Sequence, residues 1–174
     1  TIGAMPESFA KSWNTAKPGG RQVCVHAFAD DKKIINTLPY DFVCWGCGSG
    51  VKGSANDGYV QIEMCVPKEV YFENGWNYRT SNKEKTKQYI KDMVDIVVDW
   101  TTDRLIEMGI EEVNKGTVMG HYEAHKIGIA SNHSDPKGLL SLAGITMDDF
   151  RNKCKVSLSE KMEDINMKRY QTLK

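Results

Sequence analysis

The strongest constraint on the fold of this chain is one long amphipathic helix predicted between two short strand-like segments. Ser81-Asn82-Lys83-Glu84 has the spacing of a capping box, and Gly109 stands where a helix would end. A helix is therefore expected over about 82–108, with Tyr89, Met93, Val97 and Trp100 on its apolar face. The alternating segment 59–65 precedes it and the apolar run 117–119 follows it. Together these three segments predict a right-handed βαβ unit.

A second group of strands is expected nearer the N-terminus. Residues 21–28 alternate in polarity, and Asp30-Asp31 can turn the chain into a second strand at 34–38. A short helix after Pro6 is expected before this hairpin, because Met5, Phe9 and Trp13 recur on one helical face. The hairpin combined with the βαβ unit predicts the α/β class, with a central mixed β-sheet flanked by helices.

The length of 174 residues, 40% of them hydrophobic, suits one domain and a tail. Thr146 can cap a short helix that turns Met147 and Phe150 inward, whereas 157–174 has the pattern of a separate, highly charged amphipathic helix. We therefore expect a catalytic domain over 1–155. A linker helix over 156–174 is expected to lead towards a C-terminal module.

The charge and cysteine content narrow the class of partner. The 23 basic and 23 acidic side chains balance, so no long-range field favours nucleic acid or an anionic membrane. No stretch approaches the roughly 20 apolar residues that a membrane-spanning helix needs, and residues 1–13 lack a signal-peptide pattern. The five cysteines form an odd and sparse set, which predicts free thiols made in a reducing compartment. Cys44-Trp45-Gly46-Cys47 has no second cysteine pair, so this motif is interpreted as incidental.

The segment from Val118 to Pro136 contains the residues best suited to a catalytic or metal-binding site. Its sequence predicts a strand that ends at His121, followed by a loop that contains His133 and Asp135. Zinc accepts imidazole nitrogen and carboxylate oxygen, so His121 and Asp135 could converge on one metal ion. The spacing alone equally allows a structural histidine and a turn aspartate before Pro136.

Two further patterns leave alternatives open. His121 and His125 could suggest a zincin protease, but Tyr122 stands where that motif needs glutamate, and the preceding residues favour a strand and loop. Glu63 lies on a strand between apolar neighbours, so partial burial would raise its pKa and suit it to base catalysis. It could instead form an ion pair on an exposed sheet edge. His26 on the hairpin could face the same cleft.

Residues from about Phe9 to Arg151 resemble the type-2 N-acetylmuramoyl-L-alanine amidases. This superfamily also contains peptidoglycan recognition proteins and phage amidases, and the similarity is greatest to prophage endolysins of clostridia-like bacteria. The order of many motifs makes the resemblance specific. The motifs are Trp13-Asn14-Thr15-Ala16-Lys17-Pro18-Gly19-Gly20-Arg21, Val25-His26-Ala27-Phe28, Leu38-Pro39, Ser54-Ala55-Asn56, Ile62-Glu63-Met64-Cys65, Gly120-His121-Tyr122-Glu123, Ser131-Asn132-His133-Ser134-Asp135 and Met147-Asp148-Asp149-Phe150-Arg151.

The resemblance implies an amidase-2, peptidoglycan-recognition-like fold and a zinc-dependent hydrolase. It makes His121 and Asp135 zinc ligands, Glu63 the catalytic carboxylate and His133 the group that stabilises the oxyanion. The implied substrate is the amide bond between N-acetylmuramic acid and L-alanine in bacterial peptidoglycan. The protein would be made in the cytoplasm and would act on the cell wall after release. The substrate-contacting residues implied are His26, Trp45 and Asn56.

Two departures from the family pattern qualify this expectation. Relatives often have Trp-His where this chain has Trp45-Gly46, which removes one substrate-facing imidazole. The family's first zinc ligand is a histidine on an N-terminal strand that would precede Thr1, so we expect the domain to lack that strand and ligand. A non-catalytic peptidoglycan-binding module is the competing class. The presence of Asp135 favours an enzyme, because non-catalytic relatives typically lack that ligand.

Overall fold

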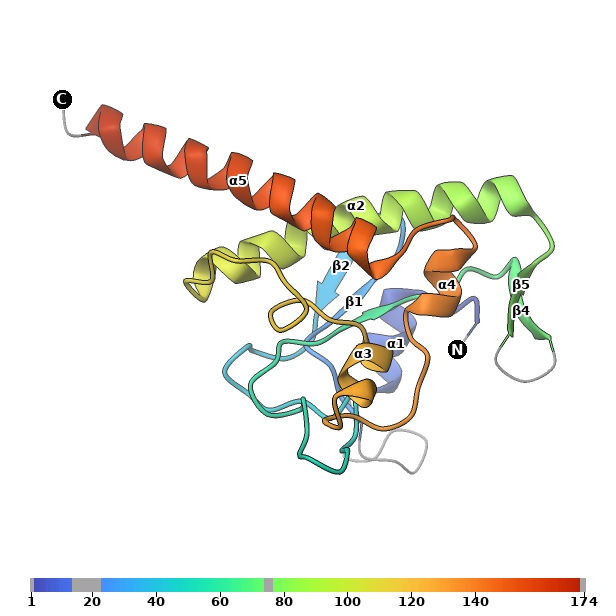
Figure 1. Ribbon diagram of the computed structural model, residues 1–174. Helices are drawn as coiled ribbons and strands as arrows, with labels where there is room; N and C mark the ends of the chain where they lie inside the picture. The colour runs from blue at the N-terminus through green and yellow to red at the C-terminus, as the bar shows by residue number, and fades with distance from the viewer. Residues whose placement is uncertain (1, 14–22, 74–76, 173–174) are drawn as a thin grey trace.

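The computed structural model describes residues 2–13, 23–73 and 77–172 and has an α/β architecture (Figure 1). The helices are α1 (Pro6–Ser12), α2 (Lys83–Glu107), α3 (His121–Lys126), α4 (Lys137–Ser141) and α5 (Met147–Thr172). The strands are β1 (Ala27–Ala29), β2 (Ile34–Asn36), β3 (Ile62–Met64), β4 (Val70–Glu73) and β5 (Asn77–Thr80).

The central sheet has the strand order β2-β1-β3, with β1 antiparallel to β2 and parallel to β3. The predicted hairpin and mixed sheet are therefore confirmed, with shorter strands than the alternation indicated. Successive side chains of a strand point to opposite faces. Ala29 accordingly joins the core formed with α2 and α5, whereas Phe28 packs against Phe9 of α1. Glu63 is paired in register with Phe28, so it lies on the α1 face of the sheet.

Helix α2 matches its sequence prediction closely. The Asn82 side chain accepts a hydrogen bond from the Lys85 amide at 3.1 Å, which caps the helix start. Gly109 follows the helix with a φ of 68°, a left-handed conformation that glycine adopts at low cost. The buried face of α2 covers the sheet and packs against α5. Its fully buried apolar side chains include Ile90, Met93, Val94 and Val97.

The strand predicted at 117–119 is absent, so the βαβ expectation was wrong. The Asn114 side chain accepts hydrogen bonds from the amides of Gly116 and Thr117, which closes a local turn. Asparagine and threonine favour such turns over an extended strand. Directly afterwards the Glu123 carboxylate accepts a hydrogen bond from the Gly120 amide at 3.0 Å and caps α3. His121 therefore begins a helix instead of ending a strand.

The C-terminal segment is one continuous helix, α5, where the sequence analysis expected a short helix and a separate charged one. Nothing breaks the helix between the two parts, and Cys154 and Leu158 continue the buried face that begins with Met147 and Phe150. The later turns extend beyond the body of the molecule (Figure 1). Within the described residues, neither long helix carries a stretch apolar enough to cross a bilayer. The division at residue 155 falls inside α5 and stays a prediction.

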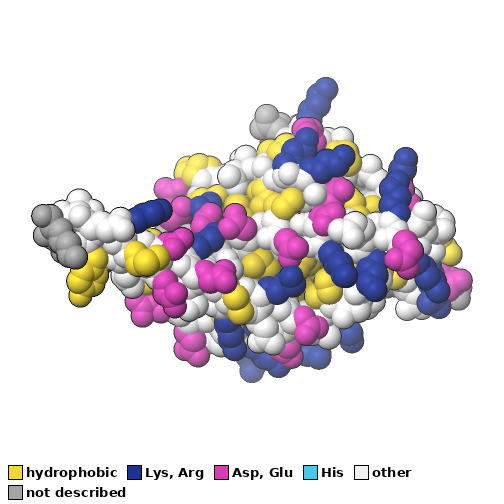
Figure 2. Space-filling model, turned by 90° about the horizontal axis from the view of Figure 1, so that it is seen from above, with side chains coloured by type: hydrophobic (Ala, Val, Ile, Leu, Met, Phe, Trp, Pro, Cys, Tyr) yellow, Lys and Arg dark blue, Asp and Glu magenta, His cyan; other side chains and the backbone are white. Residues whose placement is uncertain are grey.

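The surface around α5 carries interspersed charges of both signs (Figure 2). Lys161, for example, lies between Asp99 and Asp103 of α2 at 2.6 Å from each carboxylate. Such pairs are partly exposed and contribute little stability individually. No histidine side chain is visible on this face.

One ion pair is buried and ties α3 to α5. The guanidinium of Arg151 donates to both carboxylate oxygens of Glu123, at 2.8 and 2.9 Å. It also donates to the Val118 carbonyl oxygen at 3.1 Å and to Asp148 at 2.6 Å. The Arg151 side chain is only 5% exposed and that of Glu123 14%. This pair fixes the start of α3, where His121 lies.

We predict that Arg151→Met lowers the free energy of unfolding by about 3–5 kcal/mol, because it leaves the Glu123 carboxylate buried without its partner. Urea denaturation followed by circular dichroism measures the change. The control Lys153→Met removes an exposed pair with Asp95 and should cost less than about 1 kcal/mol. Equal losses in the two variants would contradict a dominant role for the buried pair. Combining Arg151→Met with Glu123→Met should recover much of the lost stability.

Candidate functional site

The structure gathers ionisable side chains from β3, β5, α3 and the loop before α4. We call this group the β3–α3 cluster; its members are Glu63, Tyr78, His121, His133 and Asp135. They come from four separate parts of the chain, and contacts or electrostatic coupling link each of them to at least one other member. Four of the five were proposed from the sequence.

Glu63 has a strongly perturbed carboxyl group. Its side chain is exposed, against the expectation of partial burial, yet surrounding protein atoms partly desolvate the carboxyl. Desolvation by this surrounding raises the pKa of Glu63 to about 7, and the negative charge of Asp135 adds to the rise. A carboxyl group with this pKa can both accept and release a proton near neutral pH.

Tyr78 connects strand β5 to the cluster. Its hydroxyl donates a hydrogen bond to Oδ1 of Asp135 at 3.3 Å. The close approach depends on Gly138 at the start of α4, since a Cβ there would lie 2.3 Å from the Tyr78 ring. Burial raises the pKa of Tyr78, and the nearby Asp135 carboxylate raises it further. Tyr78 therefore stays a protonated donor that orients Asp135.

His121 and His133 lie side by side next to Asp135. Their ring centroids are 4.9 Å apart, and Nδ1 of His133 is 3.7 Å from Oδ2 of Asp135. Burial lowers the pKa of His121, the neighbouring His133 lowers it further, and Asp135 opposes both effects. Nε2 of His121 contacts the Ser131 hydroxyl at 3.2 Å. His121 is consequently favoured in its neutral form, which is the form that can bind a metal ion.

The predicted substrate contacts divide into one exposed and two buried residues. Trp45 is 53% exposed and can meet a ligand. The predicted substrate contact of His26 was wrong, because the residue is 1% exposed and both ring nitrogens form hydrogen bonds within the protein. Nε2 donates to the Phe42 carbonyl oxygen at 2.9 Å, and Nδ1 accepts from the Gln61 amide at 3.0 Å. It therefore has no nitrogen left for substrate or metal.

Asn56 also has an internal role instead of the expected substrate contact. The side chain is 7% exposed. Its Oδ1 accepts from the Cys47 amide at 3.1 Å, and its Nδ2 donates to the Gly48 carbonyl oxygen at 3.3 Å. Asn56 thus holds the loop that carries Trp45, so its effect on substrate would be indirect.

The donor set of the cluster suits zinc only in part. His121 and Asp135 are residue types that bind zinc, but catalytic sites usually have three protein ligands. Across 2–13, 23–73 and 77–172, no group of three or more His, Cys, Asp or Glu side chains is arranged to hold a metal ion. The described residues therefore do not complete a catalytic zinc site by themselves.

A helix over His121–Lys126 meets one requirement of the zincin hypothesis, contrary to the expected strand and loop. The other requirements are not met. Tyr122 occupies the place of the catalytic glutamate, and Glu123 is paired with Arg151. Nδ1 of His125 contacts the Ala130 carbonyl oxygen at 3.1 Å. The zincin hypothesis is therefore not supported.

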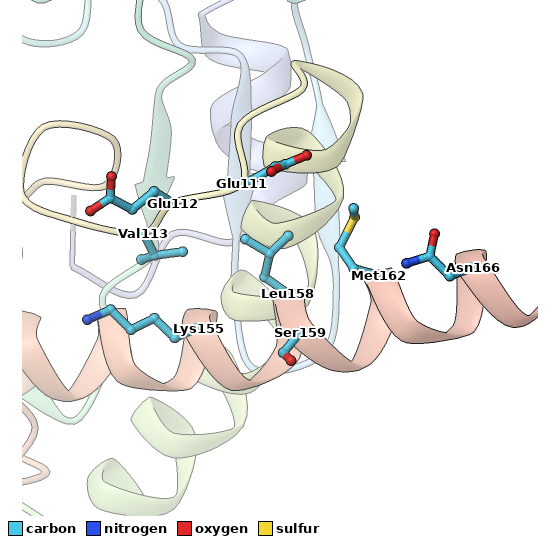
Figure 3. A pocket seen from close by; sticks show the side chains of 8 residues that line it. All are labelled: Glu111, Glu112, Val113, Lys155, Leu158, Ser159, Met162 and Asn166. Carbon is cyan, nitrogen blue, oxygen red and sulfur yellow. The ribbon is translucent and has the colours of Figure 1, made fainter.

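Two surface hollows lie away from the cluster, along α5. Figure 3 shows the one between α5 and the loop that follows α2, with a volume of about 610 Å³. The second lies between α2 and α5 and measures about 390 Å³. Neither contains a candidate residue. The residues of the first hollow are Glu111, Glu112, Val113, Lys155, Leu158, Ser159, Met162 and Asn166.

No role for Tyr78 or Ser131 was predicted from the sequence. Tyr78 lies 57 positions before Asp135, its hydrogen-bond partner, and no local pattern connects the two. Ser131 stood inside a quoted motif, four residues before Asp135, but its hydroxyl partner His121 is ten residues earlier. The one sequence signal that could have indicated Ser131 is its place in the same motif as His133 and Asp135.

Comparison with known proteins gives two kinds of similarity. No family model matches the chain. The bifunctional autolysins of Staphylococcus aureus strains N315 and COL are 27% identical to it over 117 residues, which is 67% of this chain. That match covers 8% of the length of each autolysin.

A solved structure shares the fold. The crystal structure of Staphylococcus aureus hydrolase AmiA in complex with its ligand superimposes with a TM-score of 0.60 at 23% sequence identity. The superposition covers 81% of this chain and 61% of that one. The expected fold class, a mixed sheet flanked by helices, is thereby confirmed.

The raised pKa of Glu63 predicts how a Glu63→Gln variant changes stability with pH. A carboxyl with a folded-state pKa of about 7 stabilises the fold only while it is protonated, so this contribution is lost as pH rises from about 4.5 to 7. Glutamine does not titrate. The melting temperature of Glu63→Gln minus that of the wild type should increase across this range and level off above it. Calorimetry at a series of pH values measures this difference, and a constant difference would refute the raised pKa.

Proposed function

We propose that this chain hydrolyses the amide bond between N-acetylmuramic acid and L-alanine in bacterial peptidoglycan, as a zinc-dependent N-acetylmuramoyl-L-alanine amidase. The observation that carries the proposal is Glu63, a carboxyl with a pKa of about 7 that is coupled to Asp135 beside two histidines. The names of the similar proteins, an autolysin and a hydrolase, support this class of activity. Peptidoglycan is then the partner and the cell wall the place of action.

Glu63 is proposed as the general base and acid of the reaction. Amide hydrolysis requires removal of a proton from water and delivery of a proton to the leaving amine. A single group performs both steps best when its pKa lies near the working pH. At neutral pH about half of the Glu63 carboxyls would be ionised, so both forms are available.

His133 is proposed to stabilise the charge that develops on the amide oxygen. The side chain is 47% exposed and its ring lies beside that of His121. It can therefore reach a bound substrate while staying close to the cluster. A ring N–H directed at the developing oxyanion lowers the energy of the transition state.

Trp45 is proposed to contact the muropeptide outside the reacting bond. Its exposed ring is held on a loop anchored from both ends, by the hydrogen bonds of His26 to Phe42 and of Asn56 to Cys47. An exposed aromatic side chain on a fixed backbone offers apolar area at little conformational cost. His26 and Asn56 would then influence substrate affinity through this loop.

The zinc requirement is proposed from the donor types of His121 and Asp135. These two side chains would hold the ion, which supplies Lewis-acid chemistry when bound. Because three protein ligands are usual, the pair alone is expected to bind zinc weakly. The assignment of residues 1–155 as the catalytic domain and 156–174 as a linker, and an origin in a prophage endolysin, stay predictions.

We predict that Glu63→Gln reduces muropeptide hydrolysis by a factor on the order of 10² to 10⁴, the usual contribution of a general acid–base group. The reaction is measured by release of free L-alanine amino groups from purified cell walls. In the wild type, kcat/KM should rise with pH around an apparent pKa of about 7, because the base must be ionised. Binding of Glu63→Gln to cell walls should persist. If the wild-type protein binds cell walls but does not cleave them, the alternative of a non-catalytic binding module is favoured.

We predict that His121→Ala and Asp135→Ala each lower zinc uptake, measured by elemental analysis after equilibrium dialysis at several zinc concentrations. Each removes one of two proposed ligands. The matched control is His125→Ala, since His125 lies on the same helix with its Nδ1 against a backbone carbonyl. Uptake unchanged by all three substitutions would exclude zinc from the β3–α3 cluster.

A further inference from the structure

We propose that Ser131 is a positioning residue that fixes the tautomer of His121, so that Nε2 carries the proton and Nδ1 presents a lone pair. This inference deepens the proposed function, since it concerns how one of the proposed zinc ligands is prepared. It rests on a chain of hydrogen bonds that joins His121 to a backbone carbonyl through the Ser131 hydroxyl.

The Cys47 carbonyl oxygen, the last group in this series of hydrogen bonds, determines which groups donate. The Ser131 hydroxyl donates to the Cys47 carbonyl oxygen at 2.9 Å, and a carbonyl oxygen can only accept. A hydroxyl has a single proton, so the Ser131 oxygen is left as an acceptor. Nε2 of His121 lies 3.2 Å from that oxygen, and with the hydroxyl donating to Cys47 it takes the role of donor. In a neutral imidazole the other nitrogen, Nδ1, is then unprotonated.

The Cys47 carbonyl is itself held in place. The Ser131 amide donates to it at 2.9 Å, so Ser131 binds this oxygen through both its backbone and its side chain. The Cys47 amide donates to the buried Asn56 side chain. Two further hydrogen bonds join the same two loops, from Lys52 N to Gly128 O and from Ala55 N to Ile129 O, both at 2.7 Å.

Gly48 shows how closely the two loops approach at Ser131. Its φ of 65° lies in the left-handed region that glycine tolerates best. A Cβ at Gly48 would lie 2.9 Å from the Ser131 hydroxyl oxygen and 3.0 Å from the Ser131 Cβ. The backbone therefore packs directly against Ser131, which leaves its hydroxyl little freedom to turn away from His121.

The consequence concerns the chemistry of His121. Histidines that bind metals almost always donate their other ring N–H to a fixed acceptor, and loss of such an acceptor typically weakens metal binding 10- to 100-fold. The His121 ring lies beside His133 in the β3–α3 cluster. Ser131 thus keeps the nitrogen that faces away from it available as a ligand.

The tautomer is measured directly by long-range proton–nitrogen correlation NMR of the whole chain labelled with ¹⁵N-histidine, without metal, at about pH 8, above the usual histidine pKa. The chain has four histidines, and the signal missing from His121→Gln identifies His121. The wild type should show His121 protonated on Nε2. Ser131→Ala should give a mixture of tautomers. Ser131→Thr, which keeps the hydroxyl, and the control Ser134→Ala in the same loop should retain the wild-type pattern.

Zinc affinity, measured by calorimetric titration with zinc chloride, gives the second readout. We expect a 10- to 100-fold loss for Ser131→Ala and none for Ser134→Ala. His121 protonated on Nδ1 in the wild type would overturn the proposal, and so would an unchanged tautomer or an unchanged zinc affinity in Ser131→Ala. If Ser131→Ala does not fold, the wild-type tautomer and the Ser131→Thr spectrum decide. Absence of amidase activity with the predicted tautomer would contradict only the proposed function.

Discussion

The buried pair between Arg151 and Glu123 is the interaction on which the arrangement of the candidate site depends. Glu123 caps the first turn of α3 through the Gly120 amide, and the same carboxylate takes two hydrogen bonds from Arg151 on α5. His121 directly follows Gly120 and is the first residue of α3. An ionised pair is tolerated at low exposure only when its hydrogen bonds are satisfied, as they are here. The core formed by α2 and α5 therefore sets the position of the helix that presents His121.

A second constraint acts from the opposite side, where two loops without regular structure pack against each other. A Cβ at Gly50 would lie 2.2 Å from the Gly128 carbonyl oxygen, and one at Gly46 would lie 2.4 Å from the Gln61 side chain. These contacts need glycine because the backbone approaches another backbone segment or a hydrogen-bonded side-chain amide. These loops, and not a longer sheet, fix the positions of Trp45 and Ser131. Order in this half of the molecule thus comes from hydrogen bonds and close packing more than from secondary structure.

The sequence predicted best those elements whose patterns depend on local periodicity. Helix α2 has a cap, an apolar face and a terminal glycine, so its bounds were found within one or two residues. The run at 117–119 is apolar enough for a strand, but the hydrogen bonds that the Asn114 side chain accepts and the cap by Glu123 favour a turn and a helix. The continuity of α5 was missed because its second half is charged and lacks a buried face. Among site residues, His133 and Asp135 belong to one motif of the sequence, whereas Tyr78 reaches Asp135 only through tertiary packing.

The coupling between Glu63 and Asp135 would connect the proposed acid–base chemistry to the binding of a cation at the β3–α3 cluster. Desolvation by nearby protein atoms is the main cause of the raised pKa of Glu63, and the negative charge of Asp135 adds to it. A positive charge bound at Asp135 would remove that second contribution and attract the ionised form of Glu63. By linkage, ionisation of Glu63 would in turn favour binding of the cation. The proton affinity of the proposed base and any metal affinity of its neighbour would therefore be coupled. Tyr78 and Ser131, through Asp135 and His121, would act on both.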